Sequence, residues 1–258
     1  MLPNFLIIGA ARSGTTTLYN RLQGHPDIYL PASKRPEPHF FLKGAELGRG
    51  LRYYEERYFS RWSGQKAVGE ASTSYVFGAD VPQRIRASLP DVKLICLLRN
   101  PVERAFSGYW HTVASGLETL SFEDAIAREG ARKTQLAGTA LGEIAPFAYV
   151  ERGLYHEQLL RWLRVFERSA LKIVLFDDLI GQPEAMLHDI VRFLGVPPQA
   201  LPSRELEKEN MSVPDGIRIS KKTRELLIER FRDDVTALEA LLGRDLRHWL
   251  AAEGADKE

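Results

Sequence analysis

Cysteine is almost absent from this sequence, and long apolar runs are absent altogether. The one cysteine, Cys96, excludes a disulfide within the chain and a cysteine-rich zinc site. It lies in the apolar run LICLL, which indicates a packed side chain rather than a nucleophile. No stretch approaches the ~20 apolar residues that span a membrane. The first apolar run stops at Gly9 with no basic segment before it, so we expect no signal peptide. The default expectation is a soluble, cytoplasmic protein without a membrane span.

An excess of either charge is also missing. Lys and Arg number 35 and Asp and Glu number 34, which leaves a net charge of +1. This balance argues against a surface built for nucleic acid, so we expect no nucleic-acid partner, and any bound anion must be held by a local cluster. The 258 residues are 44% hydrophobic, which is ordinary for a globular protein. That length suits a single α/β domain, which we place over 1–258. The composition does not indicate an oligomeric state.

Apolar runs separated by segments of helical spacing organise the chain. The predicted strands are 5–8, 94–98 and 172–176, with weaker ones at 27–30 and 67–70. The predicted helices are 15–23, 80–89, 101–114, 154–166 and 183–195, the last of which ends at a glycine. Continuous rather than alternating apolar strands favour a parallel sheet flanked by helices on both faces. Such sheets bind ligands beyond the carboxyl ends of their strands.

Three segments stand apart from this alternation. Residues 115–150 are rich in glycine and alanine with weak periodicity, and we interpret them as an insertion or a lid. Residues 201–220 are polar with two prolines and are expected to form a long loop. The stretch DDVTALEALLGRDLRHWL, which starts at Asp233, predicts an amphipathic helix, a turn and a docking tryptophan, Trp249.

The loop after the first predicted strand resembles a phosphate-binding loop without its lysine. In GAARSGTTTL, Gly9 and Gly14 have the spacing of G-x-x-x-x-G-K-[ST], and Thr15 stands where the lysine belongs. A strand, a tight turn and a helix start aim backbone N–H groups and the helix dipole at one anion. Losing the lysine argues against a triphosphate. The alternative is an ordinary strand–turn–helix junction. The candidate anion-binding residues are Arg12, Ser13, Gly14, Thr15, Thr16 and Thr17.

A second loop follows the strand 94–98. In LICLLRNPVERAFSGYWH, Arg99 leaves the strand at its carboxyl end, and Pro101 suits the first position of a helix. Ser107 lies eight residues further on, two turns into that helix. The two side chains would form a second small anion pocket beside the first loop. Taken alone, this segment favours the alternative, in which Arg99 pairs with a nearby acid such as Glu103 and Ser107 is only a small helix residue.

Together, GAARSGTTTL and LLRNPVERAFSGYWH resemble the loops of sulfotransferases that use 3′-phosphoadenosine-5′-phosphosulfate (PAPS). The resemblance implies that the 12–17 turn holds the 5′ end of this donor and that Arg99 and Ser107 hold its 3′-phosphate. The segments EPHFF (37–41) and GEASTSYVF (69–77) are similar to the branch that acts on heparan-type sugars. The segments GLYHEQLLRWLRVF (153–166) and LEALLGRDLRHWL (238–250) are similar to bacterial relatives. Arg12 replaces a lysine common in the family, and Ala71 replaces a lysine of that branch. For the branch's late cofactor segment, the nearest stand-ins are Lys208, Asn210 and Ser212.

The resemblance implies transfer of a sulfuryl group from PAPS to a hydroxyl or amine of a carbohydrate or other small-molecule acceptor, leaving adenosine 3′,5′-bisphosphate. Arg12 and the loop donors would stabilise the leaving phosphate, and no metal is expected. By the same resemblance Glu70 is the catalytic base, and burial at the sheet edge would raise its pKa. His39 is the second candidate base. The basic pair Lys34 and Arg35 guides an anionic acceptor or forms a solvated loop.

Two other functions remain open from the sequence. IVLFDD (173–178) is typical of a strand that holds magnesium, which favours a P-loop kinase using Mg-ATP on a small molecule. A nucleotide-binding regulatory protein without turnover would keep both anion loops and have no use for a base at Glu70. Binding of a 3′,5′-bisphosphate without magnesium separates the sulfotransferase from the kinase.

Overall fold

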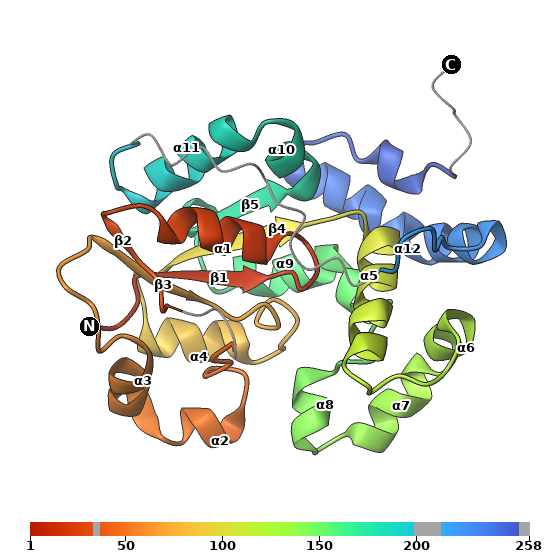
Figure 1. Ribbon diagram of the computed structural model, residues 1–258, viewed down its shortest axis with the longest axis horizontal. Coiled ribbons are helices and arrows are strands. Elements are labelled where there is room, and N and C mark those ends of the chain that lie inside the picture. Colours follow the sequence, from red (N-terminus) through yellow and green to blue (C-terminus); the bar gives the residue numbers. More distant parts are fainter. Residues whose placement is uncertain (33–36, 199–212, 253–258) are drawn as a thin grey trace. The chain divides into compact units, whose positions relative to one another are not determined.

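The computed structural model describes residues 1–32, 37–198 and 213–252 (Figure 1). Its contacts divide the chain into two compact units, each described here by itself. The first unit comprises 1–99 and 161–210, and the second comprises 100–160 and 211–258. No helix among the described residues combines the length and the apolar character needed to cross a membrane.

The first unit contains a five-stranded parallel sheet. Its strands are β1 (Phe5–Gly9), β2 (Ile28–Tyr29), β3 (Ala67–Ala71), β4 (Lys93–Leu98) and β5 (Leu171–Leu175). They lie in the order β2-β3-β1-β4-β5, and every pair is parallel. All five predicted strands are confirmed. Because β1 and β4 are direct neighbours, the loops that follow them leave the same edge of the sheet.

Helices cover the sheet on both faces, which confirms the predicted fold class. The helices of this unit are α1 (Thr15–Gln23), α2 (Gly44–Leu47), α3 (Gly50–Tyr58), α4 (Val81–Ser88), α10 (Phe176–Gly181) and α11 (Pro183–Leu194), with a 3₁₀ turn η2 (Arg168–Ala170). Figure 1 shows α1 and α11 on one side of the sheet and α4 on the other. The predicted helices α1, α4 and α11 are confirmed, and α11 ends at Gly195 with φ +80°. The helices α2, α3 and α10 were not predicted.

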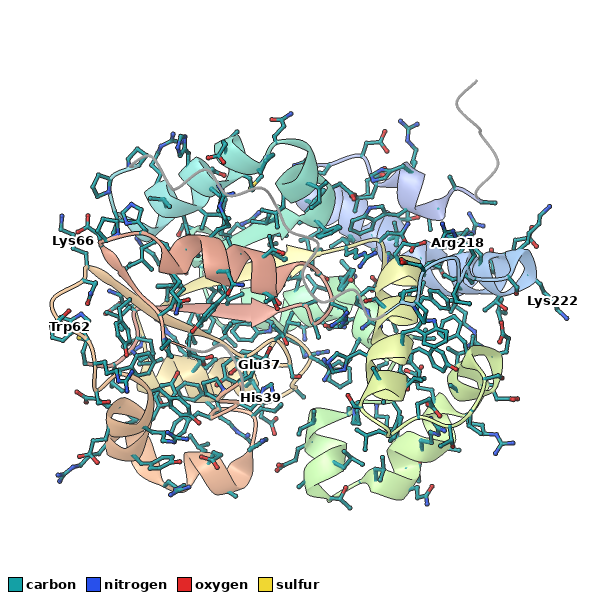
Figure 2. All side chains as sticks on the ribbon, in the orientation of Figure 1. Glu37, His39, Trp62, Lys66, Arg218 and Lys222 are labelled. Carbon is teal, nitrogen blue, oxygen red and sulfur yellow. The ribbon has the colours of Figure 1, made fainter. Side chains whose placement is uncertain are left out.

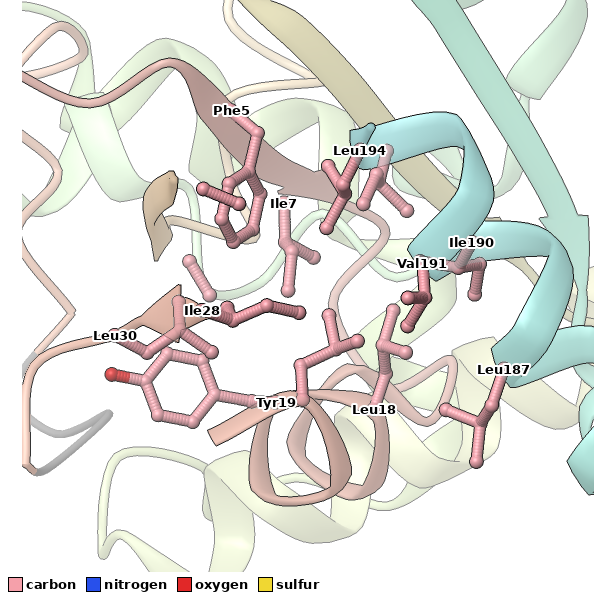
Figure 3. Close-up of a cluster of buried hydrophobic side chains, with 14 of the residues drawn as sticks. Phe5, Ile7, Leu18, Tyr19, Ile28, Leu30, Leu187, Ile190, Val191 and Leu194 are labelled. Carbon is pink, nitrogen blue, oxygen red and sulfur yellow. The ribbon is translucent and has the colours of Figure 1, made fainter. Parts of the chain in front are cut away.

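A buried apolar cluster holds α1 and α11 to the sheet (Figure 3). It includes Ile7 of β1, Leu18 of α1 and Leu187 of α11, all without exposed surface. β1 and β4 are buried on both faces, so their apolar runs are continuous, as the sequence pattern requires. Gly69 of β3 lies under the ring of Phe5, where an added Cβ would be 2.4 Å from the ring. This packing fixes the strands whose ends carry the candidate site.

The second unit is helical. It contains α5 (Pro101–Ala114), α6 (Phe122–Ala127), α7 (Glu129–Leu136), α8 (Ala140–Ile144), α12 (Lys221–Leu242) and the 3₁₀ turns η1 (Glu151–Gly153) and η3 (Arg247–Leu250). The helix α9 (Tyr155–Leu163) runs across the boundary between the units in sequence. The predicted helices α5 and α9 are confirmed. Asn100 caps α5 by accepting hydrogen bonds from the backbone N–H groups of Val102 and Glu103.

One prediction for this unit differs from the structure, and another stays a prediction. Residues 115–150, interpreted as an insertion or a lid, hold three short helices, and the buried Glu118 carboxylate binds Arg132 of α7. The C-terminal helix α12 begins at Lys221 rather than near Asp233, because Ser220 caps it through the N–H of Thr223. Its predicted docking tryptophan, Trp249, is 1% exposed. Of the predicted loop 201–220, residues 201–212 lie outside the described residues, and 213–220 contain no helix or strand.

Candidate active site

The loop between β1 and α1 presents the N-terminus of a helix at the carboxyl edge of the sheet. Gly14 caps α1 in the left-handed region with φ +86°, and Arg12 also has a positive φ of +71°. Among the described residues no side chain caps this helix, and its first turn holds no acidic residue. The first-turn N–H groups and the helix dipole therefore favour an anion at this position. Gly14 also permits a close approach, since an added Cβ would lie 2.7 Å from the ring of Phe176.

Ser13 and Thr15 bring hydroxyl groups to the same turn. Ser13 is fully buried, and its Oγ has no hydrogen-bond partner among the described residues. A buried polar group without a partner is costly, so a ligand oxygen that pairs with Ser13 would stabilise the loop. Thr15 is 4% exposed, and Thr16 and Thr17 are partly exposed on the first turn of α1. All these residues belong to one loop, as the sequence predicted.

Arg99 lies against this loop, as expected from adjacent strands. It follows β4 directly, and its Nη1 donates a hydrogen bond of 3.4 Å to the carbonyl oxygen of Arg12. Its guanidinium carbon lies 5.0 Å from the ring centroid of Phe176, the first residue of α10. Phe176 therefore touches both Arg99 and the Gly14 turn. Phe176 is not among the site residues predicted from the sequence, although its position at the end of a predicted strand was a usable signal.

Ser107 belongs to the second unit of the chain. It lies on α5 and is 5% exposed. Glu103, the carboxylate considered as a partner of Arg99, is bound instead by Arg224 of α12 at 2.7 Å. The pocket formed by Arg99 and Ser107 stays a prediction.

Glu70 is enclosed in the first unit rather than open to solvent. It lies on β3 opposite Leu6 and is 1% exposed. Its Oε1 accepts from the hydroxyl of Tyr54 at 3.1 Å, and its Oε2 accepts from the hydroxyl of Ser72 at 2.9 Å. Burial raises the pKa of Glu70 to about 7, although the hydrogen bonds from Ser72 and Tyr54 oppose the rise. The environment thus gives Glu70 a near-neutral pKa while both its oxygens are occupied.

A second carboxylate, Glu37, lies beside His39 and was missed as a candidate. Its Oε2 lies 3.5 Å from Nε2 of His39, and the two side chains are 10% and 13% exposed (Figure 2). Glu37 accepts hydrogen bonds from the backbone N–H of Thr73 at 2.7 Å and from its Oγ1 at 2.9 and 3.0 Å. The carbonyl oxygen of Thr73 lies 3.1 Å from where a Cβ on Gly9 would stand. Thr73 therefore lies between Glu37 and Gly9, the first residue of the loop that leads into α1.

The remaining predicted residues lie partly within and partly outside the described ranges. Lys34, Arg35, Lys208, Asn210 and Ser212 lie outside the described residues. Within the described ranges no cluster of three or more His, Cys, Asp or Glu side chains is arranged to hold a metal ion. Asp177 and Asp178, the acids of the kinase alternative, lie in the first turn of α10.

One edge of the sheet thus combines a helix N-terminus that no described side chain caps, a guanidinium beside it and a carboxylate–histidine pair. These features are those of a P-loop-like fold, in which the helix N-terminus after β1 is suited to an anionic group. A model of the sulfotransferase domain matches residues 2–218. The chain belongs to the sulfotransferase family.

Known relatives agree with this membership. Heparan sulfate glucosamine 3-O-sulfotransferase 6 of Homo sapiens is 34% identical over 194 residues, which cover 75% of this chain and 52% of that protein. The chain therefore spans about half the length of this curated relative. The crystal structure of a sulfotransferase from Alicyclobacillus acidocaldarius is 37% identical with a TM-score of 0.81, covering 97% of this chain and all of that one. Mouse sulfotransferase SULT7A1, solved in complex with PAP, shares the fold at 16% identity and a TM-score of 0.52, over 93% of this chain and 89% of that one.

Proposed function

We propose that this protein transfers a sulfuryl group from PAPS to a hydroxyl or amine of a small-molecule or carbohydrate acceptor, releasing adenosine 3′,5′-bisphosphate. The observation that carries the proposal is the loop at the start of α1, where the buried Ser13 hydroxyl has no hydrogen-bond partner among the described residues and Arg99 lies beside the loop. A donor with one phosphate before its sulfonate does not need the lysine that a triphosphate loop uses, which agrees with Thr15 at that position.

In this proposal the loop holds the 5′ end of the donor. The first-turn N–H groups of α1, with the hydroxyls of Ser13, Thr15, Thr16 and Thr17, donate to the phosphate and sulfonate oxygens. Arg12 stabilises the charge that develops on the departing phosphate, in the manner of a preorganised electrostatic clamp. Arg99 and Ser107 hold the 3′-phosphate. The reaction is an in-line displacement in which positioning and charge stabilisation do most of the work.

We assign the role of base to Glu37 and keep Glu70 as the alternative. Glu37 is partly exposed, borders Gly9 through Thr73 and has His39 beside it. An acceptor hydroxyl can reach such a carboxylate, and general-base catalysis requires hydrogen-bond reach to the proton that is removed. Glu70 has the more suitable pKa, about 7, but it is 1% exposed, so an acceptor hydroxyl cannot reach it as it can reach Glu37. His39 would orient the Glu37 carboxylate or replace it as base.

The acceptor class is proposed from the relatives alone. The human relative is named for action on the glucosamine of heparan sulfate, and a mouse relative, bifunctional heparan sulfate N-deacetylase/N-sulfotransferase 4, is 31% identical over 76% of this chain and 23% of that protein. These names favour a carbohydrate acceptor and leave O- and N-sulfation open. The cytoplasmic location expected from the sequence stays a prediction.

The test starts with binding and then measures turnover. Adenosine 3′,5′-bisphosphate at a hundredfold its Kd should stabilise the protein by about 2.7 kcal/mol, with EDTA present. Transfer of label from PAPS is then measured over panels of sugars, phenols and alkyl alcohols. Stabilisation by Mg-ATP and not by the bisphosphate would favour the kinase instead. Binding without transfer to any acceptor would favour the regulatory protein.

The base assignment is tested with Glu37→Gln and Glu70→Gln side by side. Glu37→Gln should lower kcat at least about a hundredfold, because general-base catalysis contributes that much, while the Kd for the bisphosphate is unchanged. If Glu37→Gln keeps its kcat and Glu70→Gln loses it, Glu70 is the base.

A further inference from the structure

Ser72 joins two parts of the site that lie far apart in the sequence. It follows β3 directly and has no exposed surface. Its Oγ accepts a hydrogen bond of 2.9 Å from the backbone N–H of His39 and donates one of 2.9 Å to Oε2 of Glu70. A buried serine thus connects the enclosed carboxylate of Glu70 to the segment that carries Glu37 and His39.

The backbone at His39 needs such a support. Its φ is +48°, in the left-handed region that a residue with a side chain adopts only at a cost. The carbonyl oxygen of His39 accepts from the N–H groups of Leu42 and Lys43, both at 3.0 Å, which closes a turn on that side. The bond from its own N–H to Ser72 secures the other side. Losing that bond would release the turn where Glu37 and His39 are placed.

Glu70 sets the direction of the serine hydroxyl. A backbone N–H can only donate, so Ser72 must offer a lone pair to His39 and send its single proton elsewhere. The Oε2 of Glu70 receives that proton. The other oxygen of Glu70 is held by Tyr54 of α3, which fixes the carboxylate in turn. The backbone N–H of His39 therefore donates to Ser72, and the hydroxyl of Ser72 donates to Glu70.

We propose that Ser72 is a positioning residue, which, oriented by Glu70, holds the left-handed turn at His39 and thereby fixes Glu37 and His39 beside the start of the anion loop. The inference rests on the proposed function only in its kinetic consequence. In this arrangement Glu70 touches neither donor nor acceptor and acts through Ser72. An error of about 1 Å in the placement of catalytic groups costs about a hundredfold in rate, so the hydrogen bond to Ser72 matters more for turnover than for donor binding.

The test compares Ser72→Ala with Ser72→Thr and with a control, Tyr29→Phe. The control also removes one hydroxyl-to-backbone hydrogen bond of the first unit, from Tyr29 to the carbonyl of Tyr58, which involves neither Ser72 nor His39. Two readouts are taken, namely kinetics with PAPS and amide hydrogen exchange of His39 by NMR. Ser72→Ala should lower kcat about ten- to a hundredfold with KM for PAPS within twofold, and speed His39 exchange at least about tenfold. Ser72→Thr should restore both readouts in large part, and Tyr29→Phe should leave both unchanged.

Each result decides the inference. Unchanged kcat in a folded Ser72→Ala protein overturns it, as does unchanged exchange at His39, and so does an equal loss in Tyr29→Phe. If Ser72→Ala does not fold, Ser72→Cys replaces the hydroxyl with a weak acceptor of similar size and the same readouts are compared. If the natural protein transfers no sulfuryl group, the proposed function fails, and the exchange of His39 still decides whether Ser72 holds the turn.

Discussion

Replacing Glu70 with glutamine should change how the stability of the protein depends on pH. The folded-state pKa of Glu70 is about 7 and its ordinary value is 4.5, because burial disfavours the charged form. Below pH 4.5 the carboxyl group is protonated in both the folded and the unfolded protein, so its raised pKa does not lower the free energy of unfolding. As the pH rises towards and through 7, the unfolded protein loses this proton first, and the free energy of unfolding falls. The difference between these two pKa values corresponds to about 3 kcal/mol in the free energy of unfolding, at 1.36 kcal/mol per pKa unit. Glutamine does not ionise, so the variant escapes this loss.

The assay is urea unfolding of both proteins between pH 4.5 and pH 8.5, with the two free energies of unfolding subtracted at each pH. The other titrating groups are common to both proteins and cancel. The free energy of unfolding of Glu70→Gln should rise relative to that of the natural protein by about 3 kcal/mol across this range. At pH 4.5 the variant should be equal or slightly weaker, since glutamine offers one oxygen where Ser72 and Tyr54 now find two. A subtracted value that stays flat from pH 4.5 to 8.5 would show that Glu70 ionises normally in the folded protein, and the description of its environment would be wrong.

Three further predictions concern the loop and the helical unit. Arg99→Lys keeps the charge but loses the planar contact with Phe176, so binding of adenosine 3′,5′-bisphosphate should weaken about tenfold by calorimetry; equal affinity would contradict a role for the guanidinium. Gly14→Ala places a Cβ 2.7 Å from the Phe176 ring at φ +86°, so it should lower the free energy of unfolding by about 1–3 kcal/mol; a neutral effect in urea unfolding would contradict the geometry. Burial raises the pKa of Glu118, but hydrogen bonds led by that from Arg132 lower it to about 2. Its stabilisation should therefore be present above pH 4.5 and be lost towards pH 2, and Glu118→Gln should remove that pH dependence in acid unfolding.

The strands and the anion loop were predictable because their causes are local. Continuous apolar runs such as Phe5–Gly9 can be buried on both faces only in a covered parallel sheet, and the two glycines around the loop mark a turn into a helix. The place of Arg99 beside the loop followed from one further step, the adjacency of β1 and β4, which the register confirms. Local pattern and one rule of topology were enough for these elements.

The residues that the sequence analysis missed depend on contacts between distant segments. Glu37 becomes a candidate only because Thr73, 36 residues further on, binds its carboxylate next to Gly9. The enclosure of Glu70 depends in the same way on Tyr54 of α3, which lies 16 residues before it in the sequence. In the segment 115–150, Arg132 binds the carboxylate of Glu118, which lies 14 residues before it in the sequence. Polar contacts of this kind leave no periodic signal in a sequence.

Thr73 offers the sharpest way to tell the two carboxylates apart, since its side chain binds Glu37 and not Glu70. Thr73→Val keeps the shape and the backbone N–H bond to Glu37 at 2.7 Å but removes the hydroxyl bonds at 2.9 and 3.0 Å. A hydrogen bond to a charged group is worth about 1.5–3 kcal/mol. Removing the hydroxyl bond while the backbone N–H bond remains should therefore lower kcat about tenfold. Thr73→Ser keeps the hydroxyl and should stay within about threefold, and the Kd for adenosine 3′,5′-bisphosphate should be the same in all three proteins. If Glu37 is the base, the loss in Thr73→Val disappears when Glu37 is already glutamine, because the hydroxyl then supports no catalytic group. If the loss persists in that double variant, Thr73 acts elsewhere and the assignment of Glu37 fails.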